Sequence, residues 1–251
     1  MTGEVAVILA AGKGTRMKSD LPKVLFPVCG RPMIHFVLDA LAAAGVEDQV
    51  VVVGHRADDV RQELADRGDH VRFVLQDQQL GTGHAVQVCR SLLKDHTGPV
   101  LVLAGDSPLL QPSSLTKLLE HFHATKPGLL LGTLMKDDPA GLGRIVRDEA
   151  GNFLAIVEEK DATEQQRGIH EVNMSTYLFD GPALMAALDQ LQNDNSQGEY
   201  YLTDTVAILR AAGHAVEALP VLQACESLSI NNQDELQLVD ATMREMGYPV
   251  G

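Results

Sequence analysis

The sequence has few of the residues that mark several common classes of protein. Tryptophan is absent, and aromatic residues make up only 4% of the 251 positions, which disfavours a base-stacking platform for single-stranded nucleic acid. The 20 lysines and arginines are outnumbered by 34 aspartates and glutamates, so the formal net charge is −14. Such a surface repels nucleic acids and anionic membranes. We therefore expect neither as a partner.

Cysteine and long hydrophobic runs are also scarce. Cys29, Cys89 and Cys225 are odd in number, widely spaced and not in CxxC pairs, so neither a disulfide framework nor a zinc site is predicted. No run approaches the ~20 apolar residues of a membrane-spanning helix. The first residues contain no basic stretch typical of a signal peptide. These absences predict a cytoplasmic protein with free thiols.

The most informative stretch is residues 4–23, EVAVILAAGKGTRMKSDLPK. Its unbroken apolar run is typical of a strand buried on both faces of a parallel sheet. The run leads into Gly12 and Gly14 and then into cations, an arrangement that presents main-chain N–H groups to phosphate. The spacing does not match a P-loop, and a dinucleotide fingerprint would require a glycine in place of Met17. The stretch therefore predicts a phosphate-binding loop of another kind.

Apolar strands alternate with amphipathic helices over the first hundred residues. The expected elements are at 5–9, 33–44, 49–53, 57–67, 71–75, 83–93 and 99–104. This order predicts an α/β, Rossmann-like fold with a mostly parallel sheet and helices on both faces. Ligands of such sheets bind beyond the carboxyl ends of the strands. We therefore expect the glycine loop, Gln76 and Asp106 to lie at one edge of the sheet.

The second half is less regular and contains more strands. We expect strands at 128–135, 141–146, 153–158 and 172–179, and the expected helices are at 181–191, 201–212 and 233–246. The second and third of these strands are predicted to form a hairpin. No linker, repeat or low-complexity tract separates the two halves, so residues 1–251 are predicted to form a single domain.

Several short motifs occur in a characteristic order along the chain. They are LAAGKGTRMKSDLPKVL, QLGTGHA, LAGDSPL, GLGRIV, IVEEKDA, EVN, QGEYYLTD and the INN of residues 230–232. Together they resemble the pyrophosphorylase domain of the N-acetylglucosamine-1-phosphate uridyltransferases. The resemblance implies transfer of uridylyl from UTP to N-acetyl-α-D-glucosamine 1-phosphate, with release of pyrophosphate. It also implies a role in making peptidoglycan precursors for the cell wall.

The resemblance implies a role for particular residues. Arg16 would clamp the β- and γ-phosphates, and Lys23 would lie at the α-phosphate as the reaction centre's cation. Asp106 and Asn231 would bind Mg²⁺, and Gly143, Glu158 and Asn173 would contact the sugar. The nucleotide would contact Leu9, Ala10, Ala11, Gly12, Gly14, Thr15, Gln76, Gly81, Thr82, Ala104, Gly105 and Asp106.

From the residues alone, Asp106 follows a buried strand, where a carboxylate is either a Mg²⁺ ligand or a turn residue. An amide such as Gln76, together with backbone groups, can distinguish uracil from cytosine.

The resemblance also divides the domain by function. Residues of about 1–110 would bind the nucleotide, and about 111–232 would form a smaller, irregular β-rich sugar-binding half. The C-terminal helix is predicted at about 233–246. No hexapeptide repeats of an acetyltransferase β-helix are present, so we expect a monomer or a weak homodimer.

Two alternatives remain open at this point. The first is another sugar-1-phosphate nucleotidyltransferase, using glucose 1-phosphate with UTP or dTTP, since Met174 and Ser175 replace the family's usual small residue and glycine beside the sugar pocket. The second is a non-catalytic sensor of nucleotide sugars. A sensor would be free to lose four residues, and all four are present: Lys23, Arg16, Asp106 and Asn231.

Overall fold

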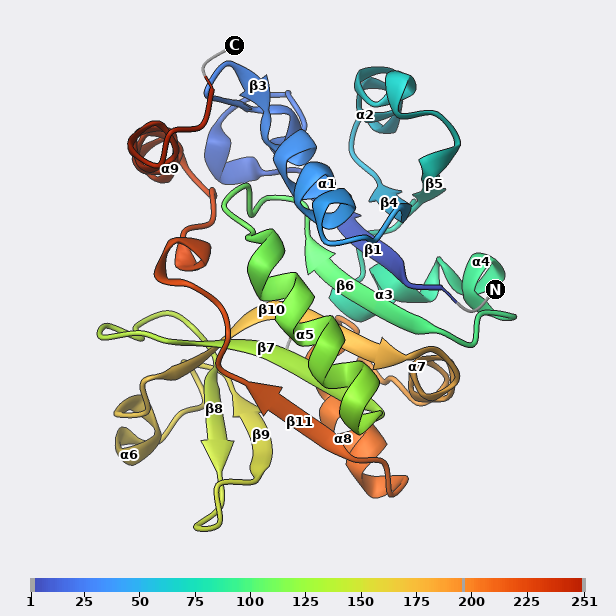
Figure 1. Ribbon diagram of the computed structural model, residues 1–251, viewed down its shortest axis with the longest axis vertical. Coiled ribbons are helices and arrows are strands. Elements are labelled where there is room, and N and C mark those ends of the chain that lie inside the picture. Colours follow the sequence, from blue (N-terminus) through green and yellow to red (C-terminus); the bar gives the residue numbers. More distant parts are fainter. Residues whose placement is uncertain (1–2, 196, 250–251) are drawn as a thin grey trace.

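A nine-stranded mixed sheet forms the centre of the fold (Figure 1). The computed structural model describes residues 3–195 and 197–249, so both ends of the predicted 1–251 domain lie just outside the described residues. The strand order is β11-β7-β10-β6-β1-β4-β5, and β8 pairs with β10 and β9. The longer strands are β1 (Val5–Ala10), β4 (Asp48–Val53), β5 (Val71–Leu75), β6 (Pro99–Ala104), β7 (Leu129–Met135), β8 (Arg144–Arg147), β9 (Phe153–Val157), β10 (Glu171–Asp180) and β11 (Val216–Leu219).

Strand β1 lies inside the sheet and pairs in parallel with β4 on one side and β6 on the other. Its apolar run is buried because both faces of the sheet are covered. Ala6, Ile8 and Ala10 belong to the core on one face. Val5 and Val7 belong to the core on the other. The period of two follows from the alternating direction of side chains along a strand.

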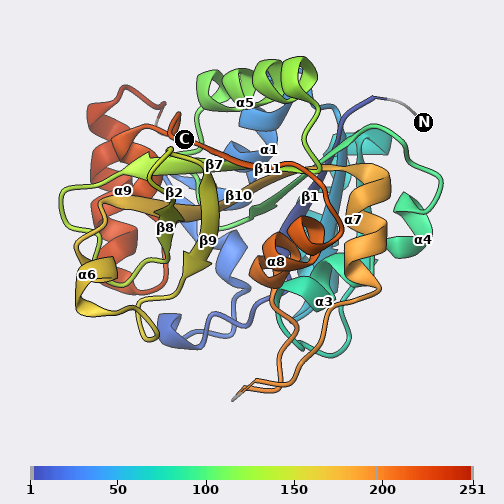
Figure 2. The same ribbon diagram turned by 90° about the horizontal axis from the view of Figure 1, so that it is seen from below.

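Helices cover both faces of this sheet (Figure 2). One face packs against α1 (Met33–Ala43), α2 (Ala57–Glu63) and α5 (Pro112–Thr125). The other packs against α3 (Thr82–Gln87), α4 (Arg90–Leu93), α7 (Gly181–Leu188) and α8 (Thr205–Ala211). None of the described helices is long and apolar enough to cross a membrane. The predicted α/β architecture is confirmed.

The C-terminal helix α9 (Gln233–Glu245) packs against the N-terminal half of the chain. It buries Val239 and Met243 in a third core cluster together with Met17, Met33 and Phe36. This cluster also includes Val28 of the short hairpin β2 (Pro27–Val28) and β3 (Arg31–Pro32). The helix therefore fixes the chain ahead of it, including Asn231, against the phosphate loop.

The second half inserts antiparallel strands into the sheet. β10 runs antiparallel to both β6 and β7, whereas β11 is parallel to β7. The expected hairpin is β8 and β9. The unpredicted elements include α5, β11, the four-residue helix α6 (Glu164–Arg167) and the short hairpin of β2 and β3. The helix expected at 83–93 is divided into α3 and α4, and the one expected at 57–67 ends at Glu63.

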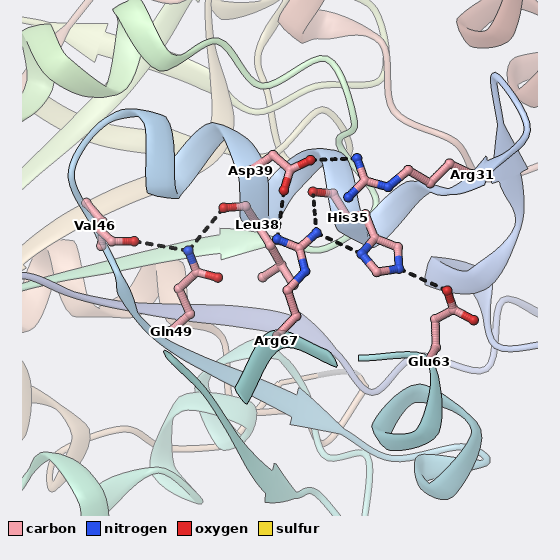
Figure 3. A network of polar contacts seen from close by, with 8 residues as sticks. All are labelled: Arg31, His35, Leu38, Asp39, Val46, Gln49, Glu63 and Arg67. Atoms are coloured by element: carbon pink, nitrogen blue, oxygen red, sulfur yellow. Dashed lines mark hydrogen bonds and ion pairs between the residues drawn. The ribbon is translucent and has the colours of Figure 1, made fainter. Parts of the chain in front are cut away.

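A network of polar side chains joins α1 to the segment between α2 and β5 (Figure 3). Arg67 donates to Asp39 Oδ1 (2.7 Å) and to His35 Nδ1 (2.8 Å), and His35 Nε2 lies 2.9 Å from Glu63 Oε1. Because Nδ1 accepts from arginine, the ring proton resides on Nε2 and points at the carboxylate. Gln49, on β4, lies at the buried end of the same region, and its amide donates to the carbonyls of Leu38 and Val46, each at 3.0 Å.

We expect Gln49→Leu to lower the free energy of unfolding by about 1–3 kcal/mol, because it leaves buried carbonyls without their donor. Gln190→Leu is the matched control, since Gln190 makes the same kind of bond to Ala186 in an exposed position. Urea titration of both variants measures the difference. Equal midpoints for the two variants would contradict this account.

Candidate active site

A cavity of about 1000 Å³ opens at the carboxyl edge of the parallel strands. Ala11 and Gly12 follow β1 there, Gln76 follows β5, and Ala104 ends β6. The predicted nucleotide-binding residues that line the cavity are Leu9, Ala11, Gly12, Gln76, Gly81, Thr82, Ala104 and Asp106. The sheet therefore brings together residues that are about a hundred positions apart.

A smaller cavity of about 230 Å³ adjoins the first and shares Leu9, Gly12 and Asp106 with it. Its remaining lining residues are Ala10, Gly14, Thr15, Arg16, Lys23 and Val24. The predicted phosphate loop and both predicted catalytic cations therefore surround one space. Gly105 is buried, and its N–H donates to the Leu9 carbonyl (2.9 Å), which holds the ends of β6 and β1 together.

Gly14 explains how the loop and Lys23 come so close. It has a φ of 60°, in the left-handed region that favours glycine. A Cβ at this position would lie 2.8 Å from the Cβ of Lys23. Any larger residue would push the lysine away from the cavity, so the glycine is required by both conformation and space.

Lys23 is the centre of a compact group of charges. Its ammonium donates to Asp106 Oδ2 and, at 2.8 Å, to Asn231 Oδ1. Arg16 Nη2 donates to the same Asn231 oxygen at 2.9 Å. The Asn231 N–H donates to Glu235 Oε2 at 2.6 Å. Its amide nitrogen reaches Ser229 Oγ at 3.2 Å, so the amide oxygen faces the two cations.

Asp106 and Asn231 fit a divalent cation. Their oxygens already converge on one cationic atom, Nζ of Lys23, and carboxylate and amide oxygens are the hard donors that Mg²⁺ prefers. Within residues 3–195 and 197–249, no cluster of three His, Cys, Asp or Glu could hold a metal ion. A cation held here would complete its shell with phosphate oxygens and water, as Mg²⁺ commonly does.

Gln76 presents its carbonyl oxygen to the large cavity. Its amide nitrogen donates to Gly81 O (3.2 Å) and to His84 Nδ1 (3.0 Å). Because a backbone carbonyl can only accept, the nitrogen must face it, and Oε1 has no hydrogen-bond partner among the described residues. His84, which we had not predicted as a ligand, therefore holds Gln76 in place. In this orientation the Gln76 side chain offers a ligand in the cavity an acceptor and not a donor.

The three residues predicted to bind sugar lie close together beside the large cavity. Glu158 and Asn173 line it, and a Cβ added to Gly143 would lie 3.5 Å from Glu158 Oε1 and 3.6 Å from Asn173 Cβ. Surrounding protein removes water from the Glu158 carboxyl and, together with the nearby charge of Asp161, raises its pKa above the ordinary value of 4.5. Solvent still reaches Glu158 through the cavity.

Asn173 is oriented by its own strand. Its Nδ2 donates to Tyr177 Oη (3.1 Å), and its Oδ1 accepts from the Ser175 N–H (3.1 Å). Burial raises the pKa of Tyr177 to about 12, so the phenol is neutral at ordinary pH. Ser175 has a φ of 55° at the register shift between β10 and β7. It keeps a left-handed conformation even though it replaces the glycine usual in the family.

Sequence reasoning missed several residues of the cavity wall. Gln79 Nε2 donates to the Ala11 carbonyl at 2.6 Å, and Tyr177 and Tyr201 also line the cavity. Gln79 and Tyr201 lie inside QLGTGHA and QGEYYLTD, so their motifs were the available signal. Tyr177 follows EVN by four positions, and no local pattern distinguishes it from the other buried residues of its strand.

Curated proteins similar to this chain share its sequence over nearly its whole length. The "Bifunctional protein GlmU" of Brevibacillus brevis is 47% identical over 240 residues, which is 96% of this chain and 51% of that protein. The "Bifunctional protein GlmU" of Heliobacterium modesticaldum is 49% identical over 246 residues, covering 98% and 53%. The chain therefore spans about half the length of the curated relatives it matches.

Solved structures share the fold at much lower identity. A putative glucose-1-phosphate thymidylyltransferase from Bacillus anthracis, in complex with a sucrose, gives a TM-score of 0.78 at 20% identity, covering 98% of this chain and 97% of that one. A UDP-glucose pyrophosphorylase complexed with UDP-glucose gives 0.76 at 16% identity, covering 98% and 100%. The model of the MobA-like NTP transferase domain matches residues 6–199. That match spans most of the chain, which therefore belongs to the family of MobA-like NTP transferase domains.

Proposed function

We propose that this chain transfers uridylyl from UTP to N-acetyl-α-D-glucosamine 1-phosphate. An oxygen of the sugar phosphate attacks the α-phosphorus of UTP, the bond from that phosphorus to the β-phosphate oxygen breaks, and pyrophosphate leaves. The products are UDP-N-acetylglucosamine and pyrophosphate. The observation that carries the proposal is the group formed by Lys23, Arg16, Asp106 and Asn231 beside two adjoining cavities.

The reaction needs positioning and neutralisation of charge more than proton transfer. Arg16 would clamp the β- and γ-phosphates with its planar guanidinium and stabilise the leaving pyrophosphate. Lys23 would face the α-phosphate, where negative charge builds up. A unit charge ~4 Å from a phosphate contributes up to about 4 kcal/mol at an effective dielectric near 20, before desolvation.

The proposal includes Mg²⁺, held by the Asp106 carboxylate and the Asn231 amide oxygen. When bound, the ion would neutralise phosphate charge next to the reacting phosphorus. Lys23 and Asp106 contact each other in the structure, and a bound triphosphate would give the ammonium an anionic partner in place of that carboxylate. Asn231 keeps its orientation through Ser229 and Glu235.

The two ends of the large cavity would recognise different parts of the substrates. Gln76 Oε1 would accept from uracil N3–H, with Gly81 and Thr82 beside it, and Glu158, Asn173 and Gly143 would contact the sugar. On this assignment the nucleotide half comprises about 1–110 and the sugar half about 111–232. We also propose that the chain acts in the cytoplasm, as its free thiols would allow, and that it is a monomer or weak dimer.

The position of Ser175 favours a second candidate activity, transfer to a different sugar phosphate. Its side chain stands beside Asn173, where the family usually has no side chain, and a pocket altered in this way would suit glucose 1-phosphate, with UTP or dTTP as the nucleotide.

The test of the proposed function is pyrophosphate release from UTP and N-acetylglucosamine 1-phosphate, with Mg²⁺ and then with excess EDTA. We expect turnover that EDTA abolishes and fresh Mg²⁺ restores. Parallel reactions with glucose 1-phosphate and with dTTP separate the two candidate activities. Binding of UTP without turnover on any sugar phosphate would indicate a sensor instead.

Lys23→Ala should lower kcat by at least about 10²–10³-fold, the usual effect of removing a preorganised group that stabilises transition-state charge. Its melting temperature should stay close to that of the parent, because Asp106 can be solvated through the cavity. Lys117→Ala, an exposed change on α5, is the control and should retain full activity. Full turnover in the Lys23 variant would overturn the assigned role.

Binding of the sugar phosphate should weaken as the pH falls through the raised pKa of Glu158, because a protonated carboxyl no longer accepts from two hydroxyls. The phosphate of the substrate itself titrates near pH 6. The informative quantity is therefore the ratio of KM values of Glu158→Gln and the parent. This ratio should be largest at neutral pH and fall toward one in acid. A ratio independent of pH would contradict the assignment.

A further inference from the structure

Arg144, the first residue of β8, is the largest side chain that the fold buries almost completely. Only 2% of it is exposed. Burying a guanidinium is costly unless its donors are matched, because a charge loses its hydration. One donor remains unmatched, since Nε of Arg144 has no hydrogen-bond partner among the described residues. The other contacts of Arg144 must therefore account for its burial.

Two of the three contacts of Arg144 lead to segments that line the large cavity. One terminal nitrogen, Nη1, donates to the carbonyl of Leu142. The other, Nη2, donates to Glu159 Oε2 at 2.6 Å and approaches the Arg167 carbonyl at 3.5 Å. The guanidinium thus joins the loop before β8, the turn after β9 and the end of α6.

Glu159 extends the connection. The oxygen that binds Arg144 also accepts from the Gly141 N–H at 3.2 Å. The Arg144 guanidinium holds the pKa of Glu159 below its usual range, so the carboxyl is ionised and strengthens both contacts. Gly141 and residues 158–161 all line the large cavity. One buried cation and one carboxylate therefore fix two separate parts of the same wall.

This wall includes the residues assigned to the sugar. Glu158 immediately precedes Glu159, so the position of the turn determines where the Glu158 carboxyl lies. Gly143 immediately precedes Arg144, and its carbonyl accepts from the Asn173 N–H at 2.8 Å. Arg144 contacts the neighbours of both residues, Leu142 and Glu159, and does not itself line the cavity.

We propose that Arg144, acting through Glu159, is a positioning residue for recognition of the sugar. It holds the loop at 141–143 and the turn at 158–161 in place. The relative positions of Gly143, Glu158 and Asn173 are thereby fixed. The inference rests on the proposed function and deepens it. Among the described residues, no hydrogen bond or ion pair joins the phosphate loop to Arg144 or Glu159, so the nucleotide end of the cavity should not depend on them.

The chain offers a matched control three residues along the same strand. Arg147 binds Glu171 through two nitrogens, at 2.7 and 2.6 Å, and also reaches the Ala218 carbonyl at 2.7 Å. Like Arg144, it joins β8 to a carboxylate on another segment, yet neither Arg147 nor Glu171 lines the cavity. The same substitution at the two arginines separates positioning of the sugar from general stability.

The experiment measures KM for each substrate in Arg144→Met, Arg144→Lys, Glu159→Gln and Arg147→Met. A small displacement of positioning groups costs up to about a hundredfold. We expect KM for the sugar 1-phosphate to rise about tenfold or more in Arg144→Met and in Glu159→Gln. KM for UTP should stay within about twofold, as for distant independent sites. Arg144→Lys should give an intermediate value because it keeps the charge but loses the planar fork.

Arg147→Met should lower the melting temperature and leave both KM values unchanged. If Arg144→Met does not fold, Glu159→Gln still tests the proposal, because that carboxylate is partly exposed and its loss need not unfold the chain. Equal changes in both KM values, or no change in either, would overturn the inference.

Hydrogen exchange gives a second readout that does not depend on turnover. Amides in 137–143 and 158–168 should exchange faster in Arg144→Met than in the parent, whereas Arg147→Met should leave these segments unchanged. Unchanged exchange in Arg144→Met would refute the positioning role. If the parent protein turns over no sugar phosphate, the proposed function fails, and the exchange result still decides whether Arg144 organises this wall.

Discussion

The pairing of β1 with β4 on one side and β6 on the other is the constraint on which the rest of the structure depends. Parallel pairing places the carboxyl ends of the three strands at one edge, where each strand is followed by a loop. The glycine loop and Asp106 lie at that edge because their strands are in register. The helices on both faces exclude water from the sheet, so this edge is where the strands meet a ligand.

Much of this arrangement could be predicted from the sequence, because local patterns determine it. The apolar runs at 71–75 and 99–104 become strands with the predicted bounds. The alternation of strands and helices specifies parallel pairing, and parallel pairing specifies a common edge for Gln76 and Asp106. The short motifs then indicated which chemistry that edge supports. All the predicted nucleotide-binding residues except Gly105 line the two cavities, because this topology brings their loops to one edge.

The features of the fold and the site that could not be predicted from the sequence depend on contacts between distant segments. The antiparallel position of β10 between β6 and β7, and its length, follow from packing. No local sequence pattern predicts which strands will pair. The role of His84 appears only when its ring meets Gln76. Arg144 looks like an ordinary charge in GLGRIV, and only its burial reveals the ion pair with Glu159. Helix α5 is a different case, because Leu115, Leu118 and Phe122 carried a helical signal that was present in the sequence.

The contacts of Lys23 also bear on the order of events during synthesis. Its partners Asp106 and Asn231 lie 83 and 208 positions further along the chain. A ribosome releases the phosphate loop long before it makes the last of these oxygens, and folding during translation proceeds from the N-terminus. A nascent chain that ends anywhere before residue 231 therefore carries Lys23 and Arg16 without their complete set of partners. The charge group closes only when α9 docks against the first forty residues, so its completion requires contact between the two ends of the chain.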